Sequence, residues 1–131
     1  MIHIVCGMIG AGKTTYCKNM KCTYTDFDEM TSKQEQIDKT IALVNKGIEV
    51  WHITTYPSGK ERLAFEKYEK EYIWINTTFS QCKQNILKRK RERDLSDLSE
   101  TLTSNRNIRG MYQNSVLQFK IINVFETEEK W

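Results

Sequence analysis

Gly7-Met8-Ile9-Gly10-Ala11-Gly12-Lys13-Thr14 is the stretch of this sequence that decides its fold. It matches the phosphate-loop pattern G-x-x-x-x-G-K-[ST] in full. An apolar run over residues 2–6, typical of a strand, precedes it, and a helical pattern over residues 13–20 follows. Glycines let such a loop curl so that backbone N–H groups point at phosphate oxygens, and the helix dipole favours the same anion. The stretch therefore predicts a site for a nucleoside triphosphate.

Each part of this loop has an expected role in binding ATP and Mg²⁺. The Lys13 ammonium can reach the β- and γ-phosphates, and the Thr14 hydroxyl can ligate Mg²⁺. Thr15 can donate a further hydrogen bond to the α-phosphate. The expected nucleotide-binding residues are Gly7, Met8, Ile9, Gly10, Ala11, Gly12, Lys13, Thr14 and Thr15. A glycine-rich turn without a ligand is the alternative, which the flanking strand and helix disfavour.

The rest of the chain alternates apolar strand-like runs with helical patterns, which predicts a parallel sheet covered by helices. We expect an α/β three-layer sandwich of the P-loop kinase type with four or five strands. Ser32 with Glu35 and Ser58 with Glu61 are capping boxes that start two of the helices. Residues 94–105 fit either a mobile loop or a short helix. The expected strands cover 2–6, 22–26, 48–54, 73–79 and 119–125, and the expected helices 13–20, 32–47, a segment after 58, a segment from 80, and 105–118.

Length and composition indicate one globular domain. The 131 residues carry a net charge of +3, too small to indicate nucleic-acid binding by itself, and no apolar run approaches the ~20 residues that span a bilayer. The N-terminus lacks the basic region and cleavage site of a secretory signal, so we expect a cytoplasmic protein. The four cysteines form no C-x-x-C pair and fit reduced, packed thiols better than a zinc site.

Among phosphate-loop proteins, a small kinase fits this chain best. The sequence has neither the D-x-x-G nor the N-K-x-D motif of a GTPase, and a motor or transporter ATPase needs a longer chain. A kinase also needs an acid near the acceptor hydroxyl and cations over the transferring phosphoryl group. Asp26 and Asp28 follow the second expected strand and are candidates for that acid. Arg89 and Arg93 share one helix face in a basic segment and are candidate lid cations.

The sequence resembles the kinase domain of the phage-type polynucleotide 5′-hydroxyl kinases, within the adenylate-kinase-like P-loop phosphotransferases. The resemblance covers most of the chain, from Ile2 to about Tyr112, and implies a single domain over 1–131 with a lid at about 86–105. It implies that Asp28 is the general base. The matching segments are Gly12-Lys13-Thr14-Thr15, Arg62-Leu63-Ala64-Phe65, Asn85-Ile86-Leu87-Lys88-Arg89 with Arg93, and Ile108-Arg109-Gly110-Met111-Tyr112.

Two positions depart from the pattern of that family. Thr31 stands where the family has an arginine that contacts the acceptor's phosphate, and Lys33 can substitute only as a flexible point charge. Thr54 stands where the family has an acid at the end of the third strand. A Thr54 hydroxyl can hold a Mg²⁺-bound water but brings no negative charge. Both departures bear on the substrate and on turnover.

The function that the sequence favours is transfer of the γ-phosphoryl group of ATP to a hydroxyl, with a polynucleotide 5′-hydroxyl as the preferred acceptor. Lys13, Asp28, Arg89 and Arg93 are the expected catalytic residues, and Thr14 is the expected metal ligand. A kinase for a nucleoside, a nucleotide or another small molecule is the alternative within enzymes. A non-catalytic nucleotide-binding module is the alternative from another class.

Overall fold

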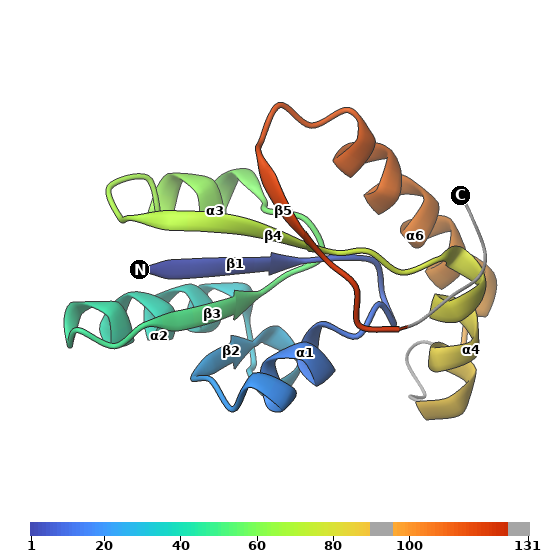
Figure 1. Cartoon of the computed structure of the whole chain (residues 1–131), viewed down its shortest axis with the longest axis horizontal. Helices are drawn as coiled ribbons and strands as arrows, with labels where there is room; N and C mark the ends of the chain where they lie inside the picture. Colours follow the sequence, from blue (N-terminus) through green and yellow to red (C-terminus); the bar gives the residue numbers. More distant parts are fainter. Residues whose placement is uncertain (90–95, 126–131) are drawn as a thin grey trace.

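The computed structural model, which describes residues 1–89 and 96–125, contains an all-parallel sheet of five strands in the order β2-β3-β1-β4-β5 (Figure 1). The strands are β1 (Ile2–Cys6), β2 (Tyr24–Asp26), β3 (Val50–Ile53), β4 (Lys70–Ile75) and β5 (Phe119–Ile122). The helices are α1 (Lys13–Met20), the short 3-10 helix η1 (Phe27–Glu29), α2 (Lys33–Asn45), α3 (Gly59–Ala64), α4 (Phe79–Arg89) and α6 (Leu98–Gln113).

The order of the strands places the phosphate loop at the centre of one sheet edge. Strand β1 is buried along its whole length between β3 and β4. After β1 the chain passes beyond β3 to form β2, whereas after β3 it crosses to β4 on the other side of β1. In open parallel sheets, ligands bind beyond the carboxyl ends of the strands at such a change of direction. The loop after β1 occupies this position.

Helices cover both faces of the sheet. Thr40 of α2 contacts His52 through a 2.8 Å hydrogen bond, and Phe65, which follows α3, packs edge-on against the same ring at 4.8 Å. Tyr112 of α6 stacks on Trp74 of β4, on the same face, at 4.0 Å. The connection from β1 to β2 moves across the sheet in the opposite direction to the other connections. Because such connections are right-handed, α1 lies on the opposite face of the sheet from α2, α3 and α6. The expected three-layer α/β sandwich is confirmed.

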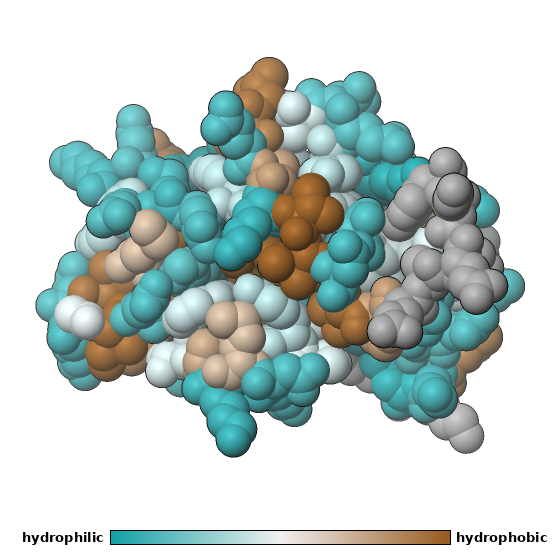
Figure 2. Space-filling model, viewed as in Figure 1, coloured by the Kyte–Doolittle hydropathy of each residue, from teal (hydrophilic) through white to brown (hydrophobic). Residues whose placement is uncertain are grey.

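The sheet also organises the core and the surface of the molecule. The buried core consists mainly of apolar residues from the three central strands, with Phe65 and Cys17 packed against them. On the face seen in Figure 2, apolar surface gathers over the edge strand β5, where Ile121 is exposed, and hydrophilic residues surround it. All four cysteines are free, which agrees with the expectation of packed thiols. In the described residues, no helix is both long and apolar enough to span a membrane.

Several expected boundaries differ from the structure, most of all between residues 94 and 118. The expected start of a helix at Asn105 is wrong, because α6 already begins at Leu98. The Asp97 side chain caps this helix by accepting a hydrogen bond from the Glu100 backbone N–H at 3.0 Å. Helix α3 ends at Ala64, earlier than its apolar pattern predicts. Strand β4 consequently begins at residue 70 rather than 73.

Candidate active site

The phosphate loop forms a curled strand-to-helix turn that depends on two glycines. Gly10 and Gly12 have φ angles of 82° and 100°, which side chains disfavour. A Cβ atom at Gly10 would also lie 2.8 Å from the backbone oxygen of Cys82, so this glycine is required for space as well. The Lys13 ammonium donates to the backbone oxygens of Gly7 at 2.7 Å and Met8 at 3.0 Å. Burial lowers the pKa of Lys13 to about 8, so it remains mainly protonated at neutral pH.

Two asparagines from distant helices hold this loop in place. The buried Asn105 of α6 accepts from the Ile9 backbone N–H at 2.6 Å and donates to the Ile9 backbone oxygen at 3.0 Å. Asn85 of α4 donates to the backbone oxygen of Gly10 at 2.8 Å. Both asparagines therefore satisfy loop backbone groups that would otherwise lack partners. Sequence reasoning treated Asn105 only as a helix boundary.

We expect Asn105→Ala to weaken both the fold and nucleotide binding. The substitution leaves the Ile9 N–H and C=O without their partner, which costs about 1–3 kcal/mol of unfolding free energy. A less ordered loop should also raise the dissociation constant for ATP. Urea unfolding and calorimetry measure the two effects, with Asn107→Ala, an exposed position on the same helix, as the control. Equal stability and affinity in the two variants would show that Asn105 does not organise the loop.

Asp26, at the end of β2, is the carboxylate that contacts the phosphate loop. Its side chain is 5% exposed, and its Oδ2 accepts from the Thr14 hydroxyl at 3.0 Å. Its Oδ1 accepts from the backbone N–H of Asp28 at 3.0 Å, which caps η1. The Asp28 side chain lies at the same cleft but is exposed. Asp26 thus contacts the phosphate loop directly, and Asp28, the base that the resemblance implies, lines the same cleft.

The Thr14 and Asp26 side chains fit a magnesium ion. A hydroxyl and a carboxylate oxygen 3.0 Å apart, next to a phosphate loop, are the hard oxygen ligands that Mg²⁺ takes together with water and substrate phosphates. The ion, when bound, neutralises charge that develops on the phosphates. Thr14 would hold it directly, and Asp26 would hold it directly or through water.

A cleft of about 780 Å³ joins the phosphate loop to the ends of β2 and β3. This volume is within the range of small-molecule sites. Arg89, at the end of α4, lies at the cleft with an exposed side chain, whereas Arg93 lies outside the described residues. The charged residues that line it are the basic Lys13, Lys18, Lys33, Lys88 and Arg89 and the acidic Asp26, Asp28 and Glu61. The cleft is therefore suited to an anionic ligand.

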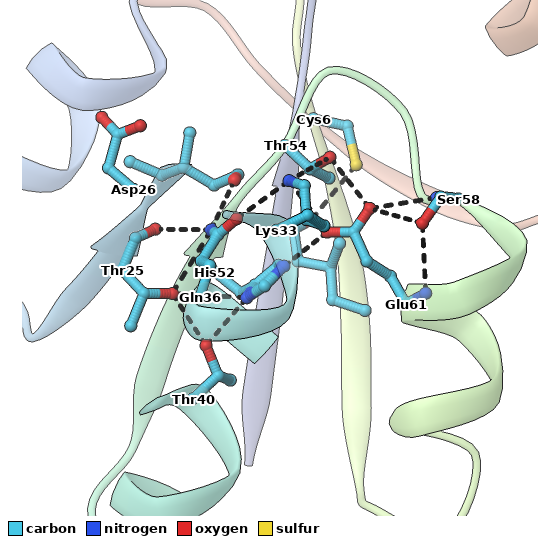
Figure 3. A network of polar contacts seen from close by, with 12 residues as sticks. Cys6, Thr25, Asp26, Lys33, Gln36, Thr40, His52, Thr54, Ser58 and Glu61 are labelled. Carbon is cyan, nitrogen blue, oxygen red and sulfur yellow. Dashed lines mark hydrogen bonds and ion pairs between the residues drawn. The ribbon is translucent and has the colours of Figure 1, made fainter. Parts of the chain in front are cut away.

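Thr54, which stands where the resembling family has an acid, has a carboxylate beside it. Its buried hydroxyl donates to Oε1 of Glu61 at 3.1 Å (Figure 3). Glu61 belongs to the capping box at the start of α3. Its side chain is only 1% exposed and forms part of the cleft wall. The charge missing at residue 54 is thus present seven residues later in the chain. Sequence reasoning recognised Glu61 as a helix cap and did not predict this second contact.

The charge of Glu61 is maintained by its neighbours. Burial alone would raise the pKa of Glu61, but the hydrogen bond from His52, the nearby Lys33 ammonium and the Ser58 N–H lower it to about 2. Burial lowers the pKa of His52, so its ring is neutral at physiological pH. A neutral ring that donates from Nε2 to Glu61 accepts at Nδ1 from Thr40.

The lowered pKa of Glu61 predicts how the free energy of unfolding changes in acid. Because folding depresses the pKa of Glu61, its ionisation stabilises the fold above about pH 4.5, and this contribution is lost as the pH falls toward 2. The stability difference between the wild type and Glu61→Gln should therefore shrink over that window. Urea unfolding at several pH values measures it, with the exposed Glu66→Gln as the control. A difference that is independent of pH would contradict the depressed pKa.

Comparisons with known proteins bear on the fold. Two solved structures of deoxyadenosine kinase from M. mycoides are similar to this chain at 15% sequence identity. The structure with bound dATP has a TM-score of 0.52, and the match covers 94% of this chain and 91% of the kinase chain. The structure with products dCMP and a flexible dCDP bound has a TM-score of 0.53, and the match covers 95% of this chain and 90% of the kinase chain. No family model matches the chain, and no curated protein matches it.

The fold is therefore similar to that of these two kinase structures, with the phosphate loop after the central strand of a five-stranded parallel sheet. At 15% identity, the likeness concerns the fold alone.

Proposed function

We propose that this protein is an ATP-dependent phosphotransferase that moves the γ-phosphoryl group to a hydroxyl of a nucleoside or nucleotide. The observation that carries the proposal is the contact between Thr14 of the phosphate loop and the buried Asp26. With a triphosphate in the loop, this carboxylate would be within reach of the hydroxyl that attacks the terminal phosphate. A nucleotide-binding module would use the same carboxylate to hold Mg²⁺, so phosphoryl transfer to an acceptor is what distinguishes an enzyme from such a module.

The reaction follows from the positions of these groups. The acceptor oxygen forms a bond to the γ-phosphorus while the bond from that phosphorus to the β–γ bridging oxygen breaks, and ADP leaves. Asp26 accepts the proton of the acceptor hydroxyl as general base. The Lys13 ammonium stabilises the charge on the β- and γ-phosphates. Arg89, and Arg93 as the resemblance implies, would add positive charge from the lid.

A nucleoside-type acceptor is the better supported choice. The structural neighbours are deoxyadenosine kinases, and one of them has the products dCMP and dCDP bound. The polynucleotide 5′-hydroxyl that the sequence favoured remains a second candidate, since Lys18, Lys88 and Arg89 add positive charge to the cleft. A strand end held by these side chains would bind through its phosphates and in a salt-dependent way.

Transfer of label from [γ-³²P]ATP tests the proposal. The acceptor panel contains deoxyadenosine, deoxycytidine, their 5′-monophosphates and a short oligonucleotide with a 5′-hydroxyl, each in 50 mM and 200 mM salt. We expect label on a nucleoside or mononucleotide, with little dependence on salt. Label on the oligonucleotide alone would favour the second candidate. ATP binding with no label on any acceptor would contradict the proposal and favour a non-catalytic module.

A further inference from the structure

A chain of buried hydrogen bonds runs beneath the cleft from α2 to α3. Gln36 Nε2 lies 3.4 Å from the Thr25 hydroxyl, which lies 2.7 Å from the Thr40 hydroxyl, and Thr40 in turn lies 2.8 Å from Nδ1 of His52. His52 Nε2 then contacts Oε2 of Glu61. All five side chains are buried, and these hydrogen bonds join four structural elements, α2, β2, β3 and α3, below the cleft (Figure 3).

All the hydrogen bonds in this network can run in one direction, from Gln36 to Glu61. With a neutral His52, each hydroxyl donates to the next member, and Nε2–H donates to Glu61 at the end. Oε1 of Glu61 also accepts from Thr54 and from both the N–H and hydroxyl of Ser58, each at 3.1 Å. Glu61 is therefore a fixed anion whose oxygens are fully partnered. Such a group suits positioning rather than proton transfer.

The cation held against this anion is Lys33, the first residue of α2. Its ammonium donates to Gln36 Oε1 at 2.9 Å, but its contacts with Glu61 Oε2 and the Thr54 hydroxyl are both 3.4 Å. Hydrogen bonds of good geometry are shorter than about 3.2 Å. The three protons of the ammonium are thus only partly used, and Lys33 lines the cleft. A further anion can be bound there without breaking the Gln36 contact.

The position of Lys33 is close to the start of the phosphate loop. Thr54 and Thr55 follow β3, and their strand end is joined to the loop by the hydrogen bond from the Gly7 N–H to the Thr55 oxygen at 3.0 Å. Lys13, Lys33 and Thr54 all line the same cleft.

We propose that Lys33 is a second catalytic cation, which contacts the transferring phosphoryl group together with Lys13, and that Glu61 and His52 are its positioning residues. This inference rests on the proposed phosphotransfer. A fixed cation acts most strongly where negative charge spreads over the equatorial oxygens of the transition state.

The test compares Lys33→Met with the control Lys39→Met, an exposed lysine on the same helix. We measure kcat and KM with the best acceptor of the panel, and by calorimetry the affinities for ATP and for ADP with aluminium fluoride, which mimics the transition state. Lys33→Met should lower kcat about 10²–10³-fold and weaken aluminium fluoride binding by a similar factor, with ATP affinity nearly unchanged. Lys33→Arg should recover part of both losses. Circular dichroism checks that every variant folds.

The positioning role has its own readout. Glu61→Gln should lower kcat less than Lys33→Met, and the double variant Lys33→Met/Glu61→Gln should be no slower than Lys33→Met alone, because both changes act through one ammonium. Additive losses in kcat would overturn this role.

Other results would overturn the catalytic role of Lys33. A raised KM for the acceptor with unchanged kcat would show that Lys33 binds the acceptor instead. Unchanged kcat, KM and aluminium fluoride affinity would show that Lys33 only forms a structural ion pair with Glu61. The aluminium fluoride measurement needs no acceptor, so it decides the role of Lys33 even if the panel shows no transfer and the proposed function fails.

Discussion

Lys13→Ala should abolish phosphoryl transfer while leaving the fold nearly intact. Among the described residues, the Lys13 ammonium donates its hydrogen bonds to backbone oxygens of its own loop, so we expect its removal to disturb the core little. It does remove the positive charge that faces the β- and γ-phosphates. Labelled-phosphate transfer measures the loss, and thermal unfolding monitored by circular dichroism checks the fold. Lys39→Ala, which changes an exposed lysine of α2 that does not line the cleft, is the control and should retain most of the activity.

Retained turnover in Lys13→Ala would contradict the assignment of residues 7–15 as the nucleotide site. A variant that fails to fold would contradict the structural part of the argument, since the side chain lies at the cleft and not in the core.

Asp26→Asn should lower kcat about 10²–10⁴-fold, as expected for removal of a general base. The asparagine keeps the size of the side chain but no longer accepts a proton at neutral pH. The Asp28→Asn variant is the matched comparison, because Asp28 lies at the same cleft with an exposed side chain. We expect Asp28→Asn to lower kcat much less. Initial rates at saturating ATP and acceptor measure both.

The opposite ranking would show that Asp28 is the base, as the family resemblance implies. Because Asp26 also lies beside Thr14, its loss can weaken magnesium binding as well. Titrating magnesium in the assay separates the two effects: a deficit that excess magnesium removes would contradict the assignment of Asp26 as base.

The part of the fold nearest the phosphate loop could be predicted from local sequence. Helix α1 begins at Lys13 and ends at Met20 as expected, because the glycines before it and the periodic pattern within it act over a few residues. Ser32 caps α2 as expected, although Glu35 bonds the Thr31 N–H and hydroxyl instead of completing the capping box. Such signals depend on near neighbours in the chain, which is why they can be read from sequence.

The long-range part of the site could not be predicted in the same way. The contact between Asn105 and Ile9 joins residues 96 positions apart, and no local pattern indicates it. The pairing of His52 with Glu61 depends on how α3 packs over β3, and the sequence showed only a histidine in a strand and a glutamate in a cap. The end of β2 at Asp26 agrees with the expected strand, and the preference for Asp26 over Asp28 rests on the contact with Thr14, 12 positions away, which no local pattern indicates.

Calorimetric titration of the wild-type protein with ATP in the presence of magnesium tests the central claim most directly. A curled loop with Lys13 at its end and the Thr14–Asp26 pair beside it predicts saturable binding with one ATP per chain, lost in Lys13→Ala and weakened when magnesium is removed. If folded wild-type protein releases or absorbs no heat with either ATP or GTP, the loop binds no triphosphate and the account is wrong.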